Sequence, residues 1–195
     1  MTRDNPVRIA NYPVNQLFLE RWSPRAMSGE AIPPDELMVL FEAARWAPSS
    51  NNNQPWRILY AHRDSAHWPT FLSLLVESNR VWAQHAAALM LFISKQSFDY
   101  NGKPSITHSF DCGAAWENLA LQGTLSGYVV HAMQGFSYMH AKSELNIPDG
   151  FQVEAMVAVG KPGRIDALPE ELQKREFPSG RKSLSEIICE GAFKF

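Results

Sequence analysis

The stretch Ala47-Pro48-Ser49-Ser50-Asn51-Asn52-Asn53-Gln54-Pro55-Trp56 separates a helical pattern from a strand pattern. Apolar residues recur at helical spacing from Leu37 to Ala47, after a Pro33-Pro34 start, and Pro48 disfavours helix at Ala47. Downstream, Trp56, Ile58 and Tyr60 alternate with other residues, which is typical of a strand. The loop between them offers small amides and hydroxyls that can hydrogen-bond a flat heterocycle. The alternative is an Asx turn that ends a helix and holds no ligand, since Asn tolerates left-handed backbone.

A second polar stretch, Arg21-Trp22-Ser23-Pro24-Arg25, lies ahead of this loop. Two guanidinium groups and a hydroxyl within five residues suit a phosphate, because Arg is planar, permanently charged and forks onto oxyanions. Arginines that only add surface solubility are the alternative interpretation. We expect a short helix over Val14–Glu20 to deliver this stretch at its end.

The rest of the chain alternates helical and strand patterns. Periodicity predicts helices over 68–77, 81–87, 111–126 and 137–145, and strands over 56–61, 89–93 and 153–159. The polar segment Asp166–Ser179 is typical of a surface connection, and an aromatic tail closes the chain. This order predicts an α+β or α/β domain without distinguishing the two topologies.

The helix over 111–126 carries unusually many small residues, among them Gly113, Ala114, Ala120 and Gly123. Small residues let another backbone approach closely, so this helix is a candidate for the centre of the fold or of a dimer. An ordinary core helix is the alternative.

The composition of the 195-residue chain bounds the classes of protein it can be. With 45% hydrophobic residues, the chain fits one domain with a substantial core. A net charge of -2 and a pI of about 6.3 provide no field for nucleic acid or an anionic membrane. The longest apolar run, 86–93, is far short of a bilayer span, so we expect a soluble, cytoplasmic protein.

Motifs for other chemistries are missing from the sequence. Cys112 and Cys189 fit no disulfide framework or metal-ligand spacing, which indicates reduced thiols, and the six His residues show no zinc pattern, so we expect no metal. The chain has no GxGxxG or GxxxxGK[ST] loop, so any phosphate must be held by side chains. No Ser-His-Asp set or Cys-His pair stands out either.

The two polar stretches, in this order and at this spacing, resemble the nitroreductase family of FMN-dependent oxidoreductases. Gln134-Gly135-Phe136 after the long helix and a late Arg181 are weaker markers of the same resemblance. The resemblance implies one domain over residues 1–195 with an α+β sandwich, in which helices flank a mainly antiparallel central sheet. It also implies a domain-intertwined homodimer that binds FMN non-covalently in a cleft shared by the two subunits.

Site residues follow from the positions that match the family. Arg21, Ser23 and the distant Arg181 resemble its phosphate ligands, and Trp22 belongs to the same cofactor-binding stretch. Arg25 resembles the basic residue near the flavin pyrimidine, where a cation favours the anionic reduced flavin.

The remaining matches concern the ring system of the flavin. In the family, residues of one subunit reach the flavin of the other, and Ser49, Ser50 and Asn52 resemble these residues. Asn79 matches a family position whose amide contacts the isoalloxazine ring. The loop whose backbone amide faces flavin N5 resembles Met133, Gln134 and Gly135. Gln134 departs from the acidic residue common in the family, and Ser179 from a second phosphate-binding Lys. The aromatic segment Ser97–Phe110 is either a lid over the flavin or a disordered surface loop.

The resemblance implies an FMN-dependent oxidoreductase that uses NADH or NADPH to reduce nitroaromatics, quinones or similar electron-poor acceptors by ping-pong hydride transfer. No catalytic side chain is needed, because the flavin carries the chemistry. One alternative is a related flavoenzyme that performs dehalogenation, ring dehydrogenation or flavin breakdown. Another is an FMN-binding regulatory or storage protein without turnover.

Overall fold

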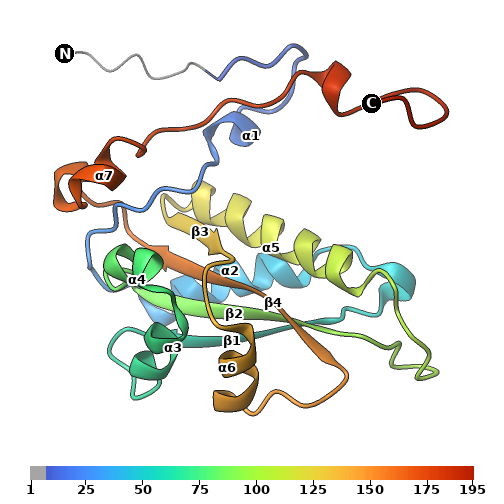
Figure 1. Cartoon of the computed structure of the whole chain (residues 1–195), viewed down its shortest axis with the longest axis horizontal. Helices are drawn as coiled ribbons and strands as arrows, with labels where there is room; N and C mark the ends of the chain where they lie inside the picture. Colours follow the sequence, from blue (N-terminus) through green and yellow to red (C-terminus); the bar gives the residue numbers. More distant parts are fainter. Residues whose placement is uncertain (1–7) are drawn as a thin grey trace.

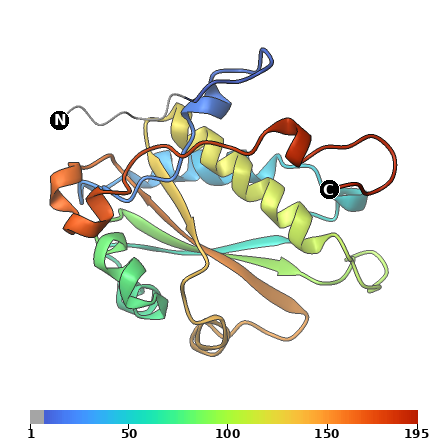
Figure 2. The ribbon, with the colours of Figure 1, turned by 45° about the horizontal axis from the view of Figure 1, so that its top comes forward.

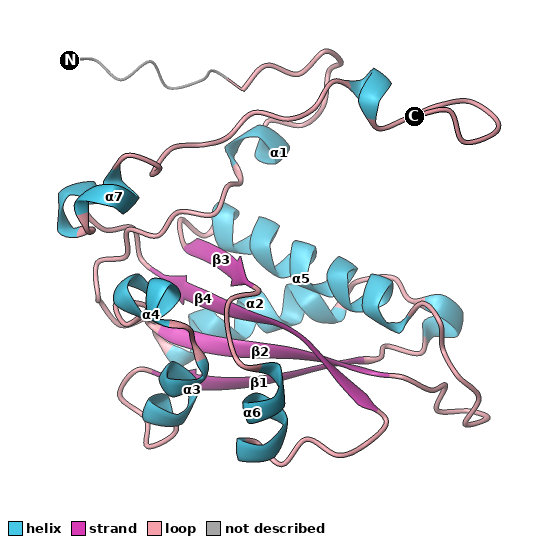
Figure 3. Ribbon diagram, in the orientation of Figure 1, coloured by secondary structure: helices cyan, strands magenta, loops and turns pink. Residues whose placement is uncertain are grey.

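The computed structural model describes residues 8–195 and places one four-stranded sheet between two helical layers (Figures 1 and 3). The strands lie in the order β1-β2-β4-β3, and every neighbouring pair is antiparallel. Their bounds are β1 Trp56–His62, β2 Ala88–Lys95, β3 Val129–Met133 and β4 Phe151–Gly160. The predicted α+β class, with an antiparallel sheet flanked by helices, is confirmed at the level of one chain.

Seven α-helices and three short 3-10 turns are present in the described part of the chain. The helices are α1 Leu17–Glu20, α2 Pro34–Arg45, α3 Trp68–Leu74, α4 Glu77–Ala83, α5 His108–Leu125, α6 Tyr138–Glu144 and α7 Glu170–Gln173. The 3-10 turns are η1 Ser50–Asn52, η2 Ile165–Ala167 and η3 Leu184–Glu186. None of these helices is long and apolar enough to cross a membrane.

Both faces of the sheet are covered (Figure 2). Alternate residues of β2 enter two separate cores: Leu89, Leu91 and Ile93 pack with α3, α4 and α6, whereas Met90 and Phe92 pack with α2 and α5. Two-sided burial explains why the sequence of β2 is continuously apolar rather than alternating. Gly123 of α5 lies directly against β3, because a Cβ there would be 2.4 Å from Cγ2 of Val130.

Several predicted boundaries were wrong. The sequence pattern predicted three strands and missed β3, because His131 interrupts a short apolar run at the sheet edge. The predicted helix over 68–77 ends at Leu74, since Leu75 is extended and forms an isolated bridge with Phe136. Helix α4 begins at Glu77 rather than near 81. Helix α1 covers only the last four residues of the range 14–20.

The segment 166–179 is mostly exposed, as its polarity predicted, but it is more than a surface connection. It contains α7 and buries Leu168 and Glu176, with the Glu176 carboxylate accepting backbone hydrogen bonds from Arg25 and Ala26. The polarity of the segment did not indicate the burial of Glu176, because a buried carboxylate can be satisfied by backbone N–H groups.

Two terminal arms, residues 8–16 and 177–195, lie on the α1 and α5 side of the sheet (Figure 1), and parts of both line one cavity. Nε of Arg8 donates a hydrogen bond to the carbonyl of Ser179 at 3.0 Å, which joins the arms. Large apolar side chains on both arms are exposed, including Ile9, Tyr12, Ile188 and Phe193.

Candidate functional site

Three arginines gather where the N-terminal arm meets α1 and the C-terminal arm. Nη1 of Arg8 donates hydrogen bonds to the carbonyl oxygens of Leu19 and Arg21 at 2.9 and 2.7 Å. The pKa of Arg8 is lowered, first by burial and then by the charges of Arg181 and Arg21. Positive charges gathered in this way have the chemistry to bind an anion. Residues 21 and 181 were predicted from the sequence, but Arg8 was not, because an isolated Arg in an N-terminal segment carries no pattern.

The partners of Arg21 and Arg181 in this structure are protein oxygens. Nε of Arg21 lies 3.4 Å from Oε1 of Glu117 on α5, with the Arg21 side chain 13% exposed. Arg181 donates to the carbonyl oxygens of Ser179 and Gly180 at 3.3 and 3.0 Å. Arg8, Arg181 and apolar residues of both arms line a cavity of about 780 Å³.

The rest of the predicted phosphate stretch lies at the C-terminal end of α5. Trp22 lines a cavity of about 290 Å³ together with Thr124, Tyr128 and Glu176, and Ser23 is half-buried. Arg25 is 22% exposed, and its Nη1 lies 3.4 Å from Oε2 of Glu176.

Asn79 and Gly135 are in direct contact. Nδ2 of Asn79 donates to the carbonyl of Gly135 at 3.0 Å, and the backbone N–H of Val76 donates to the same oxygen at 3.1 Å. A Cβ on Gly135 would lie 2.6 Å from Nδ2 of Asn79, so any side chain at this position would have to displace the Asn79 amide. The structure therefore joins α4 to the turn after β3, as expected if both serve one ligand.

The two residues before Gly135 differ in exposure. Met133 is buried in the core formed with α3, α4 and α6, whereas Gln134 is exposed. The Met133 side chain is therefore part of the core, so any polar contact from this position would come from its backbone.

The Ser/Asn loop has an unusual backbone. Asn51, Asn52 and Gln54 have φ values of 51°, 53° and 48°, in the left-handed region that non-glycine residues rarely adopt. The strain is offset by hydrogen bonds: Gln54 N–H donates to Oγ of Ser49 at 2.9 Å, and Ser50 N–H donates to Oδ2 of Asp111 at 3.0 Å. Such backbone strain clusters at functional sites.

Asp111 anchors this loop, and it was not among the residues that the sequence predicted for the site. It lies in the first turn of α5, is 4% exposed, and accepts from Ser50 N–H and from Oγ1 of Thr107. No sequence signal marked it, since a carboxylate at a helix start is ordinarily read as a complement to the helix dipole.

One chain does not bring all predicted residues together. Ser50 is fixed to Asp111 in the first turn of α5, whereas Trp22 lines a cavity with Thr124 in its last turn. At about 1.5 Å per residue these two points of α5 are about 20 Å apart along the helix. The arginine stretch and the Asn79–Gly135 contact lie along β3, because His131 contacts both the carbonyl of Pro24 and the ring of Trp82 in α4.

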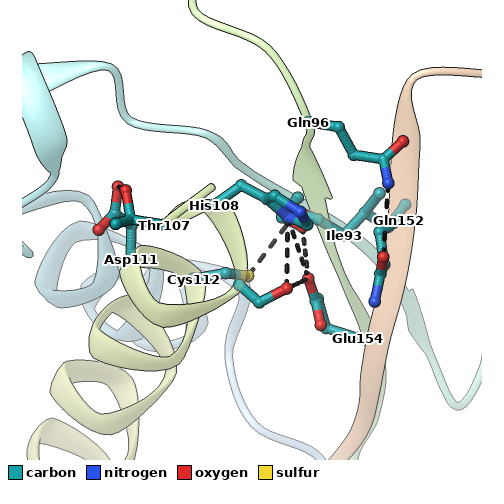
Figure 4. A network of polar contacts seen from close by, with 10 residues as sticks. Ile93, Gln96, Thr107, His108, Asp111, Cys112, Gln152 and Glu154 are labelled. Atoms are coloured by element: carbon teal, nitrogen blue, oxygen red, sulfur yellow. Dashed lines mark hydrogen bonds and ion pairs between the residues drawn. The ribbon is translucent and has the colours of Figure 1, made fainter. Parts of the chain in front are cut away.

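A polar network joins the start of α5 to the sheet (Figure 4). Oγ of Ser94 lies 2.7 Å from Nδ1 of His108, and Glu154 accepts from both Ser94 and Ser109. Glu154 is the extra residue at a bulge in the β2–β4 register, which turns its side chain toward α5. Ser94 is fully buried, and its hydroxyl shares Nδ1 with the carboxylate, so this set lacks the arrangement of a hydrolase triad, in which the two ring nitrogens serve separate partners.

The segment 97–110 is an ordered turn that continues into α5. Ser97 bridges Pro104, and the Phe98 and Tyr100 rings lie 5.4 Å apart. Asn53 links the Ser/Asn loop to this turn, donating to the Ser97 carbonyl and accepting from Asp99 N–H. Phe110 is 81% exposed in the first turn of α5. A lid role for this segment stays a prediction.

Neither cysteine is in a disulfide. Cys112 is buried, and burial raises the pKa of its thiol to about 12, so it remains protonated and unreactive. Cys189 is exposed. Over residues 8–195, no three His, Cys, Asp or Glu side chains are grouped so that they could hold a metal ion.

Comparison with known proteins agrees with this fold. The model of the nitroreductase family matches residues 19–161. A solved structure described as an oxidoreductase containing FMN is 47% identical, with a TM-score of 0.93 over 100% of this chain and 99% of that one. A nitroreductase family protein from Clostridium difficile is 21% identical, with a TM-score of 0.70 over 91% of this chain and 98% of that one, and shares the fold. Protein DrgA from Synechocystis sp. is 27% identical over 182 residues, which cover 80% of this chain and 84% of that protein.

The chain is thus an α+β protein with an arginine cluster and a strained amide-rich loop. It belongs to the nitroreductase family.

Proposed function

We propose that this protein is a homodimeric, FMN-dependent NAD(P)H oxidoreductase that reduces nitroaromatics, quinones or similar electron-poor acceptors. The observation that carries the proposal is the arginine cluster, in which burial, and after it the charges of Arg181 and Arg21, lower the pKa of Arg8. A phosphate ester with close to two negative charges would relieve this repulsion. The similar oxidoreductase at 47% identity contains FMN, which supplies such a phosphate.

The donor chemistry of the other residues fits the remaining parts of FMN. Arg8, Arg21, Ser23 and Arg181 would hold the phosphate, and Arg25 would lie at the pyrimidine edge. Asn79 keeps its side-chain oxygen available, since its Nδ2 is engaged by Gly135. Ser49, Ser50 and Asn52 would hydrogen-bond the flavin of the partner subunit. This would explain why the loop and the arginine stretch are held about 20 Å apart along α5 within one chain.

Exposed apolar surface supports the homodimer. Phe110 and Leu125 of α5 are 81% and 67% exposed, and a Cβ added to Gly113 would meet nothing within 4 Å. The arms add further apolar side chains around the 780 Å³ cavity. These exposed apolar side chains on α5 and on both arms would be covered if a second subunit packed against them. Obligate dimers bury on the order of 2,000 Å² or more of accessible surface in their interfaces.

When bound, FMN would supply the chemistry of two-electron hydride transfer between NAD(P)H and the acceptor. The protein's own residues bind and orient. The arginines fix the phosphate end, the Asn79–Gly135 contact fixes the turn after β3, and the Asp111–Ser50 bond fixes the loop offered to the partner. Arg25 places a positive charge where reduction develops negative charge. No side chain has to move a proton.

The test is the absorption spectrum of purified protein reconstituted with FMN, recorded anaerobically before and after NADH or NADPH. We expect a yellow protein that is bleached by nicotinamide, followed by parallel-line kinetics with a nitroaromatic or a quinone. A protein that cannot be loaded with FMN contradicts the proposal. Tight FMN binding without bleaching would point to a binding protein instead.

A further inference from the structure

Glu176 is a buried carboxylate that the residue roles above leave unused. Its side chain is 1% exposed, and it lies just after α7, far along the chain from the Arg21–Arg25 stretch that it contacts. A fully buried carboxylate is costly unless its oxygens are satisfied. The groups that contact the Glu176 carboxylate therefore indicate its role.

One oxygen of Glu176 fixes the backbone at Arg25. Oε1 accepts hydrogen bonds from the backbone N–H groups of Arg25 and Ala26 at 2.5 and 2.8 Å. The Gly163 N–H donates to the Ala26 carbonyl at 2.9 Å from the other side. The backbone at Arg25 is thus fixed by segments from the far end of the chain.

The other oxygen of Glu176 faces the charge of Arg25. Oε2 lies 3.4 Å from Nη1 of Arg25. Arg25 also lines a cavity together with Glu30 and Arg164. These two charged side chains have partners of their own, since Glu30 pairs with Lys161 and Arg164 pairs with Asp166. Within residues 8–195, Glu176 is therefore the carboxylate that balances Arg25.

The nearby His131 adds no positive charge to this pair. Its Nδ1–H donates to the Pro24 carbonyl at 2.8 Å, and burial lowers the pKa of His131 from its ordinary value. The imidazole is neutral at pH 7, so the local charge is set by Arg25 and Glu176.

We propose that Glu176 is a positioning residue that holds Arg25 in place and offsets part of its charge, so that bound FMN is harder to reduce than Arg25 alone would make it. The proposal rests on the proposed function, which places Arg25 at the flavin pyrimidine. A cation beside developing negative charge favours reduction, and a carboxylate next to that cation weakens the effect.

The experiment is a spectroelectrochemical midpoint of FMN-loaded wild type, Glu176→Gln, Arg25→Gln and the double variant. Glutamine keeps an oxygen for the two backbone N–H groups but removes the charge. We expect Glu176→Gln to favour reduction by about tenfold in the equilibrium constant, a rise of about 30 mV for a two-electron couple. Arg25→Gln should shift the midpoint the opposite way. Glu30→Gln, at a carboxylate that lines the same cavity but pairs with Lys161, should not move it.

The double variant contains no lone buried charge, so it stays measurable even where Glu176→Gln alone does not fold. Its midpoint should lie above that of Arg25→Gln. An unchanged or lower midpoint in Glu176→Gln, or a double variant at or below Arg25→Gln, would overturn the role of Glu176. A wild type that binds no FMN would overturn the proposed function itself, which is a different and separately visible failure.

Discussion

Asp111 and Ser50 are joined by one hydrogen bond that connects the central helix to the strained loop. Oδ2 of Asp111 accepts from the backbone N–H of Ser50 at 3.0 Å. Because the loop has three non-glycine residues at positive φ, its conformation depends on such anchors. The bond makes α5 the support of the residues that would reach the partner's cofactor.

Removing the Asp111 carboxylate should release this loop. We expect Asp111→Ala to lose about 1 to 3 kcal/mol of stability, since a partly buried N–H loses its acceptor, and to weaken FMN binding in the dimer. Asp111→Asn is the matched control, because its amide oxygen can accept the same bond. Chemical denaturation and fluorescence titration with FMN would measure both effects. Equal behaviour of the alanine and wild-type proteins would show that the bond does not support the loop.

A methyl group on Gly135 should disturb the turn after β3. The Cβ of Gly135→Ala would lie 2.6 Å from Nδ2 of Asn79 and 3.1 Å from Cγ2 of Val76. Overpacking of this kind costs about 1 to 3 kcal/mol, and we expect weaker FMN binding with it. Gly180→Ala is the control, because nothing lies within 4 Å of its added Cβ. Thermal unfolding and FMN titration that fail to separate the two variants would contradict the contact.

The sequence predicted most of the core but not the edge of the sheet. The buried strands β2 and β4 and helix α5 carry long apolar patterns, so their positions were predictable within a few residues. β3 was missed because His131, held by a carbonyl of a distant segment, does not fit an apolar pattern. Glu176 was misplaced for the same reason: its partners are backbone groups 150 residues away, which no local pattern can indicate.

The residues of the candidate site likewise fall into two groups, those that short motifs predict and those that only the fold brings together. Arg21, the Ser/Asn loop and Gly135 follow from motifs, because their chemistry is concentrated in short stretches. Arg8, Asp111 and Glu176 depend on contacts between segments far apart in the chain, which only the fold brings together.

Arg8 should contribute to anion binding together with Arg21. We expect Arg8→Ala, Arg21→Ala and Arg181→Ala each to weaken FMN binding by about 1.5 to 3 kcal/mol, about tenfold or more, through loss of a charge-assisted hydrogen bond. Arg164→Ala is the control, because Arg164 is exposed and pairs with Asp166. Titration with riboflavin, which lacks the phosphate, should show little difference among the variants. Equal losses for riboflavin and FMN would place the effect outside the phosphate.

His131 should make the fold less stable in mild acid. Burial lowers its pKa in the folded protein, so below about pH 6.5, the ordinary value, the unfolded chain binds a proton that the folded chain does not. Stability from this group is therefore present above that pH and falls as the pH drops. His131→Gln keeps a donor for the Pro24 carbonyl but does not titrate. The stability of this variant should therefore depend less on pH between about 7.5 and about 5.5, a window that brackets the ordinary His pKa. Parallel pH profiles from urea denaturation would contradict this.

The shared site can be tested by mixing two inactive subunits. Arg21→Ala damages the phosphate end of a site, and Asn52→Ala damages the loop that is proposed to reach the partner. If each site combines the phosphate end of one subunit with the loop of the other, a mixed dimer has one doubly damaged site and one intact site. We expect both homodimers to bind FMN weakly, and differently tagged, co-expressed mixed dimers to regain one tight site, about half of the wild-type FMN content. If both elements instead served the same subunit's cofactor, every site in the mixed dimer would carry one defect and no tight binding would return.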